Sequence, residues 1–178
     1  MAWFQKDDVP ATPVPGATPS AAAPKAVKIG PLLSEATVLF PAGGLDKAAV
    51  LEQLVRAVAA KAGLADPGAV LAKVLEREQG ISTTLDTGLS LPHARLVGID
   101  GILAGLAVLK APLVDPKQPE LSIRAVFLFF SPDKREAFPL HLQLLRGVAS
   151  LFQAPLIERL SASPGPADAL ALIRHSEG

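Results

Sequence analysis

Cysteine is absent from the 178-residue sequence. Its absence excludes disulfide bonds, thiolate metal sites and cysteine nucleophiles, so any chemistry must use histidine, hydroxyl, amine or carboxylate groups. The formal net charge at pH 7 is zero, because the sequence has 17 basic and 17 acidic residues. Without a global positive field, we expect neither a nucleic-acid partner nor attraction to an anionic membrane surface.

The sequence also lacks an apolar run of the roughly 18 residues that a membrane-spanning helix needs. Lys110 and the prolines after Phe130 interrupt the longest candidates. The first eight residues, MAWFQKDD, have neither a basic start nor a continuous apolar segment, so they do not resemble a secretory signal. We therefore expect a cytoplasmic protein without direct membrane insertion.

Several motifs of well-known catalytic sites are missing. The sequence has no Gly-x-Ser-x-Gly elbow, no Gly-x-x-x-x-Gly-Lys phosphate loop and no Gly-x-Gly-x-x-Gly fingerprint. It has no His-Glu-x-x-His spacing, and without cysteine a metal site of three or four ligands has little support. Hydrolase and nucleotide-binding functions are not favoured, and we expect no metal and no cofactor.

The length and the apolar content of 49% suffice for one domain with a sizeable core. Residues 9–31 consist mostly of Ala, Pro, Thr and Ser, and prolines disfavour both helices and sheet ladders. We expect a Pro/Ala-rich flexible leader over residues 1–31. A single folded domain is expected over residues 32–178.

Two helices are predicted before the first clear strand. Asp46 is a good N-cap for a helix whose apolar residues recur at helical spacing up to Gly63. Asp66 and Pro67 begin a second helix, which extends to Arg77.

Strands and further helices follow along the chain. Strand candidates lie at residues 89–91, 102–109 and 123–130. The last of them, IRAVFLFF, suits a central strand that is buried on both faces. Helical patterns return at residues 139–152, 155–160 and 166–174. The order favours an α/β fold with a sheet sandwiched between helices, and it leaves strand order and direction open.

His93 lies where chemistry is possible. It follows Pro92, which ends the preceding strand and presents the imidazole at a strand end, where ligands gather in layered α/β folds. Taken alone, a Pro-His pair is more often structural than catalytic. His175, near the C-terminus, is expected to be solvated.

His141 stands at the start of a Leu-rich helix, and its spacing to Leu144 and Leu145 places it on the apolar face. We expect it to point inward. The positive end of the helix dipole disfavours a histidine cation there, and the free backbone N–H groups can meet an anion. The alternative is a core histidine with one satisfied hydrogen bond.

Residues 77–95, REQGISTTLDTGLSLPHAR, resemble the active-site signature of the fructose, mannitol and nitrogen-regulatory enzyme IIA family of the bacterial phosphotransferase system. That signature runs Arg-Glu, Ser-Thr, Gly and Pro-His. A second family element, a histidine that opens a Leu-rich helix, matches His141. The resemblance covers residues 32–174 and implies the family's single layered domain, with a mixed β-sheet sandwiched between helices.

The resemblance implies a phosphoryl carrier. It assigns His93 as the nucleophile, His141 as the neighbour that orients the imidazole or hydrogen-bonds the phosphoryl oxygens, and Arg77 as a cation near the transferred group. Ser82 and Thr83 are expected to add hydroxyl donors to the phosphate. Histidine suits this role because, with a pKa of about 6.5, it is largely neutral near pH 7 and is nucleophilic without a separate base.

The partners that the resemblance implies are an HPr-type phosphocarrier protein, which donates the phosphoryl group, and a IIB domain or a regulated target protein. One hypothesis is a phosphotransferase step in sugar uptake. Another is a regulatory protein whose phosphorylation state controls the binding of other proteins. A third is a protein with the same fold that no longer carries a phosphoryl group. Arg95 is a weaker candidate, either as a partner contact or as an ordinary solvated charge.

Overall fold

The computed structural model describes residues 26–178. Residues 1–25, most of the predicted leader, lie outside the described residues. Ile29 is only 1% exposed and belongs to the core, so packing begins a few residues before the expected opening of the domain at Leu32.

Five strands, five α-helices and three 3-10 helices are the elements of the described chain. The strands are β1 (Val38–Leu39), β2 (Leu89–Ser90), β3 (His93–Leu96), β4 (Leu103–Val114) and β5 (Ser122–Pro132). The α-helices are α1 (Lys47–Ala62), α2 (Pro67–Gln79), α3 (Phe138–Leu151), α4 (Ala154–Ala162) and α5 (Pro166–Ser176). The 3-10 helices are Gly30–Leu32, Glu35–Thr37 and Arg135–Ala137.

The sheet is mixed, as the resemblance predicted. Strands β4 and β5 form its antiparallel centre, β1 runs parallel to β4, and both β2 and β3 run parallel to β5. Two short strands can pair with β5 in succession because β5 is long, and Pro92 separates them. The register places His93 opposite Phe129.

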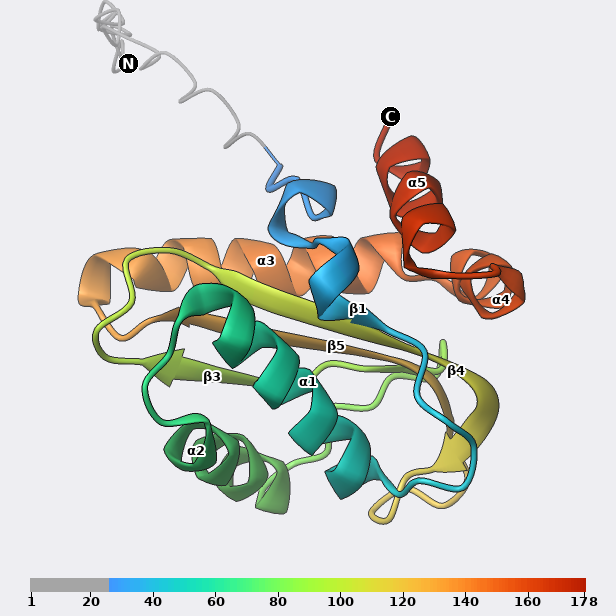
Figure 1. Ribbon diagram of the computed structural model, residues 1–178, viewed down its shortest axis with the longest axis horizontal. Helices are drawn as coiled ribbons and strands as arrows, with labels where there is room; N and C mark the ends of the chain where they lie inside the picture. Colours follow the sequence, from blue (N-terminus) through green and yellow to red (C-terminus); the bar gives the residue numbers. More distant parts are fainter. Residues whose placement is uncertain (1–25) are drawn as a thin grey trace, which may run out of the picture.

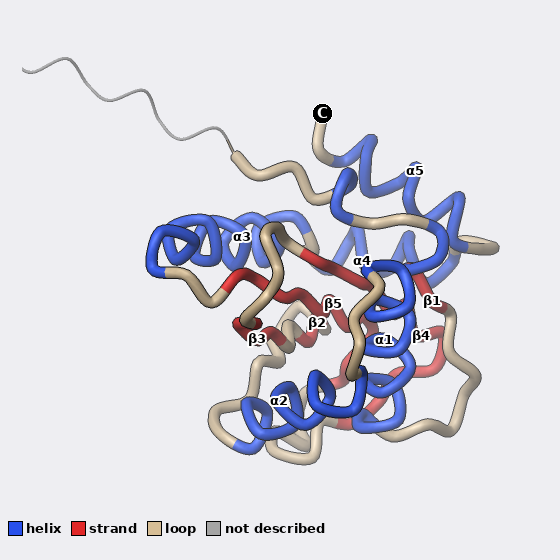
Figure 2. The backbone as a smooth tube through the Cα atoms, turned by 60° about the vertical axis from the view of Figure 1, so that its left-hand side comes forward, coloured by secondary structure: helices blue, strands red, loops and turns tan. Residues whose placement is uncertain are grey.

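Helices cover both faces of the sheet, so the predicted sandwich is confirmed (Figure 1). Alternate residues of β5 enter two cores: Phe127 and Phe129 pack with α3, α4 and α5, whereas Leu128 and Phe130 pack with α1 and α2. Figure 2 shows β3 lying between α3 and α2. None of the helices within residues 26–178 combines the length and the apolar character needed to cross a bilayer.

The predicted caps of the first two helices are observed. The Asp46 carboxylate accepts the Ala49 N–H, and Asp66 caps α2 in the same way. Gly63 ends α1 at φ 68°, in the left-handed region that favours glycine.

The predictions were less accurate for the short strands. Neither β1 nor β3 was predicted, because segments of two and four residues carry too little periodicity to identify. Consequently His93 is not at the end of the preceding strand; it is the first residue of β3, on the far side of Pro92 from β2.

Candidate active site

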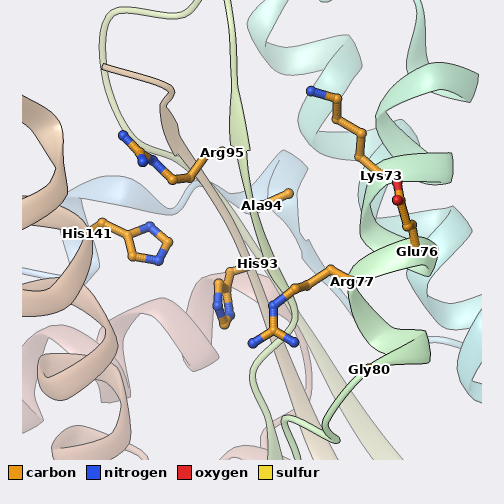
Figure 3. A pocket seen from close by; sticks show the side chains of 8 residues that line it. All are labelled: Lys73, Glu76, Arg77, Gly80, His93, Ala94, Arg95 and His141. Carbon is orange, nitrogen blue, oxygen red and sulfur yellow. The ribbon is translucent and has the colours of Figure 1, made fainter. Parts of the chain in front are cut away.

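An open pocket of about 600 Å³ lies where β3, α2 and α3 meet. Its lining residues are Lys73, Glu76, Arg77, Gly80, His93, Ala94, Arg95 and His141 (Figure 3). Three of the five predicted site residues therefore come together here, from three separate elements: Arg77 from α2, His93 from β3 and His141 from α3.

The imidazole of His93 is held in one orientation. Its Nδ1 lies 2.8 Å from the carbonyl oxygen of Leu91, and its ring stacks on Phe129 with a centroid distance of 5.3 Å. Because a carbonyl oxygen can only accept, Nδ1 carries the hydrogen and Nε2 keeps its lone pair. Within residues 26–178, Nε2 has no hydrogen-bond partner.

Burial lowers the pKa of His93 below 6.5. The hydrogen bond to Leu91 opposes this effect, the positive charge of Arg77 adds to it, and the negative charge of Glu78 opposes it. The imidazole is therefore neutral at pH 7, which leaves the Nε2 lone pair available as a nucleophile.

His141 points inward from the first turns of α3, as its spacing predicted, and is 6% exposed. Its ring centroid lies 5.2 Å from that of His93, with an angle of 64° between the rings. Burial, followed by the charges of His93, Arg95 and Arg77, lowers the pKa of His141 to about 4. His141 is thus neutral at pH 7, beside the nucleophile.

Arg77 occupies the last turn of α2, and its side chain extends into the pocket (Figure 3). In the described part of the chain its guanidinium has no hydrogen-bond or ion-pair partner. A cation that faces a pocket without a partner can bind an anion there.

Ser82 and Thr83 are not brought into the pocket. The Ser82 hydroxyl donates to Asp115 over 3.0 Å, and the Thr83 hydroxyl donates to Glu78 over 2.7 Å. Their expected role as phosphate donors therefore has no support in this arrangement, because carboxylates already accept their hydroxyl hydrogens.

These hydroxyls belong instead to a buried charge network around Asp115, which is 1% exposed. Its carboxylate accepts hydrogen bonds from the side chains of Lys47, Ser82 and Thr84 and from the backbone N–H of Lys117. Burial opposes ionisation, but these hydrogen bonds and the Lys47 charge outweigh it and hold the pKa of Asp115 well below its usual range. Lys47 also pairs with Glu78 at 2.7 Å, so the network links the end of α2 to the start of α1 and to the residue directly after β4.

The sequence did not identify two neighbours of His141. The Ser131 hydroxyl lies 2.7 Å from His141 Nδ1, and the Phe138 ring stacks on His141 at 6.2 Å. The one available signal for Ser131 was its position directly after the apolar strand pattern, beside Pro132.

The Arg95 side chain already interacts with other residues of the protein. Its guanidinium lies 5.6 Å above the Phe138 ring and donates to the carbonyl of Lys134 over 2.7 Å. It still lines the pocket and contributes positive charge there.

The described residues include no group of three or more His, Cys, Asp or Glu side chains placed to hold a metal ion. The chemistry that this geometry offers is that of a neutral imidazole nucleophile beside a second neutral imidazole and an unpaired guanidinium.

Known proteins share this fold. Nitrogen Regulatory Protein IIA-Ntr from Neisseria meningitidis matches with a TM-score of 0.70 and 20% identity, over 81% of this chain and 97% of that one. Enzyme IIA-mannitol from Escherichia coli, in its complex with phosphorylated enzyme IIB-mannitol, matches with a TM-score of 0.66 and 15% identity, over 80% and 97% of the two chains. At these identities the similarity establishes the fold.

The sequence comparisons go further. A nitrogen regulatory protein from Pseudomonas aeruginosa is 28% identical over 139 residues, which cover 78% of this chain and 89% of that protein. The family model described as phosphoenolpyruvate-dependent sugar phosphotransferase system, EIIA 2, matches residues 31–176. Because that match includes the histidine pocket and nearly all of the described residues, the chain belongs to the EIIA 2 family of the phosphoenolpyruvate-dependent sugar phosphotransferase system.

Proposed function

We propose that this protein is a phosphohistidine carrier that accepts a phosphoryl group on Nε2 of His93 and passes it to a second protein. The observation that carries the proposal is the state of the His93 ring. The Leu91 carbonyl holds its Nδ1–H, and Nε2 is left without a partner among the described residues, in a pocket shared with His141 and Arg77.

The transfer step uses the phosphohistidine of an HPr-type phosphocarrier as the donor. The Nε2 lone pair of His93 forms a bond to phosphorus while the bond between phosphorus and the donor nitrogen breaks, and that electron pair leaves with the donor imidazole. No proton has to leave His93, because Nδ1–H keeps its hydrogen bond to Leu91. Onward transfer is the same step with the acceptor's nucleophile attacking phosphorus, so catalysis consists of positioning and charge stabilisation.

The other two pocket residues suit the charge of the phosphoryl group. Arg77 offers an unpaired guanidinium to the phosphoryl oxygens, as phosphate recognition commonly requires. His141, buried and neutral, supplies hydrogen bonding close to the nucleophile without a competing positive charge.

The proposal is tested by incubating the purified protein with phosphoenolpyruvate, enzyme I and HPr, and then measuring intact mass and acid lability. We expect one acid-labile phosphate on the wild type and none on His93→Ala. His141→Ala should accept phosphate more slowly. The matched control is His175→Ala, which replaces an exposed histidine on α5 and should behave as wild type. An unmodified wild type in the presence of phosphorylated HPr would refute the carrier function.

For the downstream step we propose transfer to a IIB domain in sugar uptake. The fold shared with enzyme IIA-mannitol, whose structure was solved with phosphorylated enzyme IIB-mannitol, supports this partner. The second candidate is regulation, in which the phosphorylation state controls binding of a target protein. The 28% identity to a nitrogen regulatory protein favours that candidate.

A chase experiment separates the two candidates. The protein is phosphorylated with a labelled phosphoryl group and mixed with the IIB domains of its own organism. The amount of labelled phosphoryl group on each protein is then followed. Transfer of the label to a IIB domain supports sugar uptake. Retention of the label on His93 in the presence of every IIB domain supports regulation.

A further inference from the structure

The side-chain hydroxyl of Ser131 has a single hydrogen-bond partner within residues 26–178. Ser131 lies in β5, is completely buried, and shares the face of that strand with Phe129, the face that α3 covers. Its Oγ is 2.7 Å from Nδ1 of His141. No other side-chain or backbone group of residues 26–178 is hydrogen-bonded to this hydroxyl.

The number of available donors and acceptors then shows which of the two groups donates this hydrogen bond. The hydroxyl has one hydrogen, and Nδ1 of His141 is the acceptor within reach. If Nδ1 donated instead, the hydroxyl hydrogen would stay unpaired in a fully buried site, which is unfavourable. The neutral state of His141, whose pKa burial and then the charges of His93, Arg95 and Arg77 lower to about 4, lets Nδ1 accept.

We propose that Ser131 is a positioning residue that holds His141 in the tautomer with its hydrogen on Nε2. His141 is then a hydrogen-bond donor on the edge that Ser131 does not occupy. The Phe138 ring stacks on the His141 ring with a centroid distance of 6.2 Å, and the centroid of the Phe129 ring lies 5.2 Å from that of His141. These aromatic neighbours restrain the orientation of the imidazole. The tautomer follows from the structure alone, and its consequence, donation to a phosphoryl oxygen, rests on the proposed function.

The tautomer decides whether His141 attracts or repels a phosphoryl group on His93. A phosphoryl group presents only acceptor oxygens, so an Nε2–H group attracts it, whereas an Nε2 lone pair would repel it. Because His93 has its hydrogen on Nδ1 and His141 has it on Nε2, the two histidines are complementary. One offers a lone pair to phosphorus and the other offers a donor to oxygen.

The tautomer is measured directly by ¹⁵N–¹H correlation spectra of the imidazoles in the unphosphorylated wild type at pH 7. We expect His141 to show a protonated Nε2 and an unprotonated, hydrogen-bonded Nδ1. A spectrum with the hydrogen on Nδ1 would overturn the proposal. This result does not depend on phosphorylation, so the tautomer and the carrier function fail separately.

Substitutions then test the role of the hydroxyl. Ser131→Ala should raise the population of the Nδ1–H tautomer of His141 and slow phosphoryl acceptance on the order of tenfold, the effect of losing one well-placed hydrogen bond. The matched control is Ser90→Ala, because Ser90 is equally buried in β2 but its hydroxyl has no hydrogen-bond partner in the described residues. Ser90→Ala should keep both the wild-type tautomer and the wild-type rate.

Ser131→Thr retains the hydroxyl and should restore the Nε2–H tautomer. If Ser131→Ala showed the wild-type tautomer, or if Ser90→Ala shifted it equally, Ser131 would not be the residue that sets it. Should Ser131→Ala fail to fold, the wild-type spectrum still decides the tautomer.

Discussion

Arg77 and Glu78 are neighbours in the last turn of α2, but their side chains lie in two polar regions of different kinds. Arg77 faces the open histidine pocket, where it has no partner among the described residues. Glu78 pairs with Lys47 at 2.7 Å and accepts a hydrogen bond from Thr83 in the buried network around Asp115.

The two regions differ in how completely their polar groups are satisfied. In the network, the Asp115 carboxylate accepts several hydrogen bonds and lies next to a cation. In the pocket, the guanidinium of Arg77 and the Nε2 of His93 are both without partners in residues 26–178. Satisfied groups hold the geometry, and the groups without partners are the ones that a phosphoryl group can engage. At neutral pH, stability should therefore depend mainly on the network, and transfer on the pocket.

The largest effect should come from the network. Asp115→Ala leaves the Ser82 and Thr84 hydroxyls without their acceptor and removes one of the two carboxylates beside the Lys47 ammonium, so we expect the free energy of unfolding to fall by about 3 to 5 kcal/mol. Urea denaturation measures the loss. The control is Glu52→Ala, which breaks an exposed i,i+4 pair with Arg56 and should cost about 0.5 kcal/mol or less. Equal losses in the two variants would contradict the assignment.

The pocket should show the opposite behaviour. Arg77→Ala should slow phosphoryl acceptance by about 10²-fold to 10³-fold, the effect of removing one group that stabilises charge in the transition state. Its stability should stay within about 0.5 kcal/mol of wild type. Arg159→Ala, which also removes an exposed arginine from the last turn of a helix, is the matched control and should leave the rate unchanged. A rate for Arg77→Ala close to that of the control would exclude a role for Arg77 in transfer.

Acid should weaken the fold through the pocket histidines. His141 has a pKa of about 4 in the folded protein and about 6.5 when unfolded, so the unfolded chain binds more protons between these values. The free energy of unfolding should have its full value above pH 6.5 and should decrease by on the order of 3 kcal/mol as the pH falls toward 4. The lowered pKa of His93 acts in the same direction.

Urea midpoints between pH 4 and 8 test this dependence. His141→Gln should flatten the profile, whereas His175→Gln, at an exposed position, should keep the wild-type slope. A wild-type profile without a slope between pH 4 and 6.5 would show that His141 is not held neutral by its surroundings.

The smallest effect concerns the boundary between the two regions. Thr83→Ala removes one hydrogen bond to Glu78, so we expect a loss of stability of about 1 kcal/mol and no change in the rate of phosphoryl acceptance. A large decrease in rate would instead place the hydroxyl at the phosphoryl group, as the family resemblance implied.

Local patterns predicted most of the fold. The caps Asp46 and Asp66 and the helical spacing of apolar residues located α1 and α2, because capping and amphipathicity are properties of neighbouring residues. The long strands β4 and β5 were identified from apolar, β-prone runs, although the prediction for β4 ended at residue 109 and the strand continues to Val114. Strand β3 was missed because only its pairing with β5 makes those four residues a strand.

For the candidate site, the sequence by itself determined the family and predicted His93, His141 and Arg77 as site residues, since residue types in a fixed register carry that information. Only the tertiary structure decided what each group contacts. It turned the hydroxyls of Ser82 and Thr83 toward carboxylates and placed Ser131 against His141. Asp115 lies 33 positions from Ser82 and 68 from Lys47, and no local pattern relates residues so far apart. Hydrogen-bond partners are chosen by distance in space, which the chain acquires only when the sheet and its helices pack together.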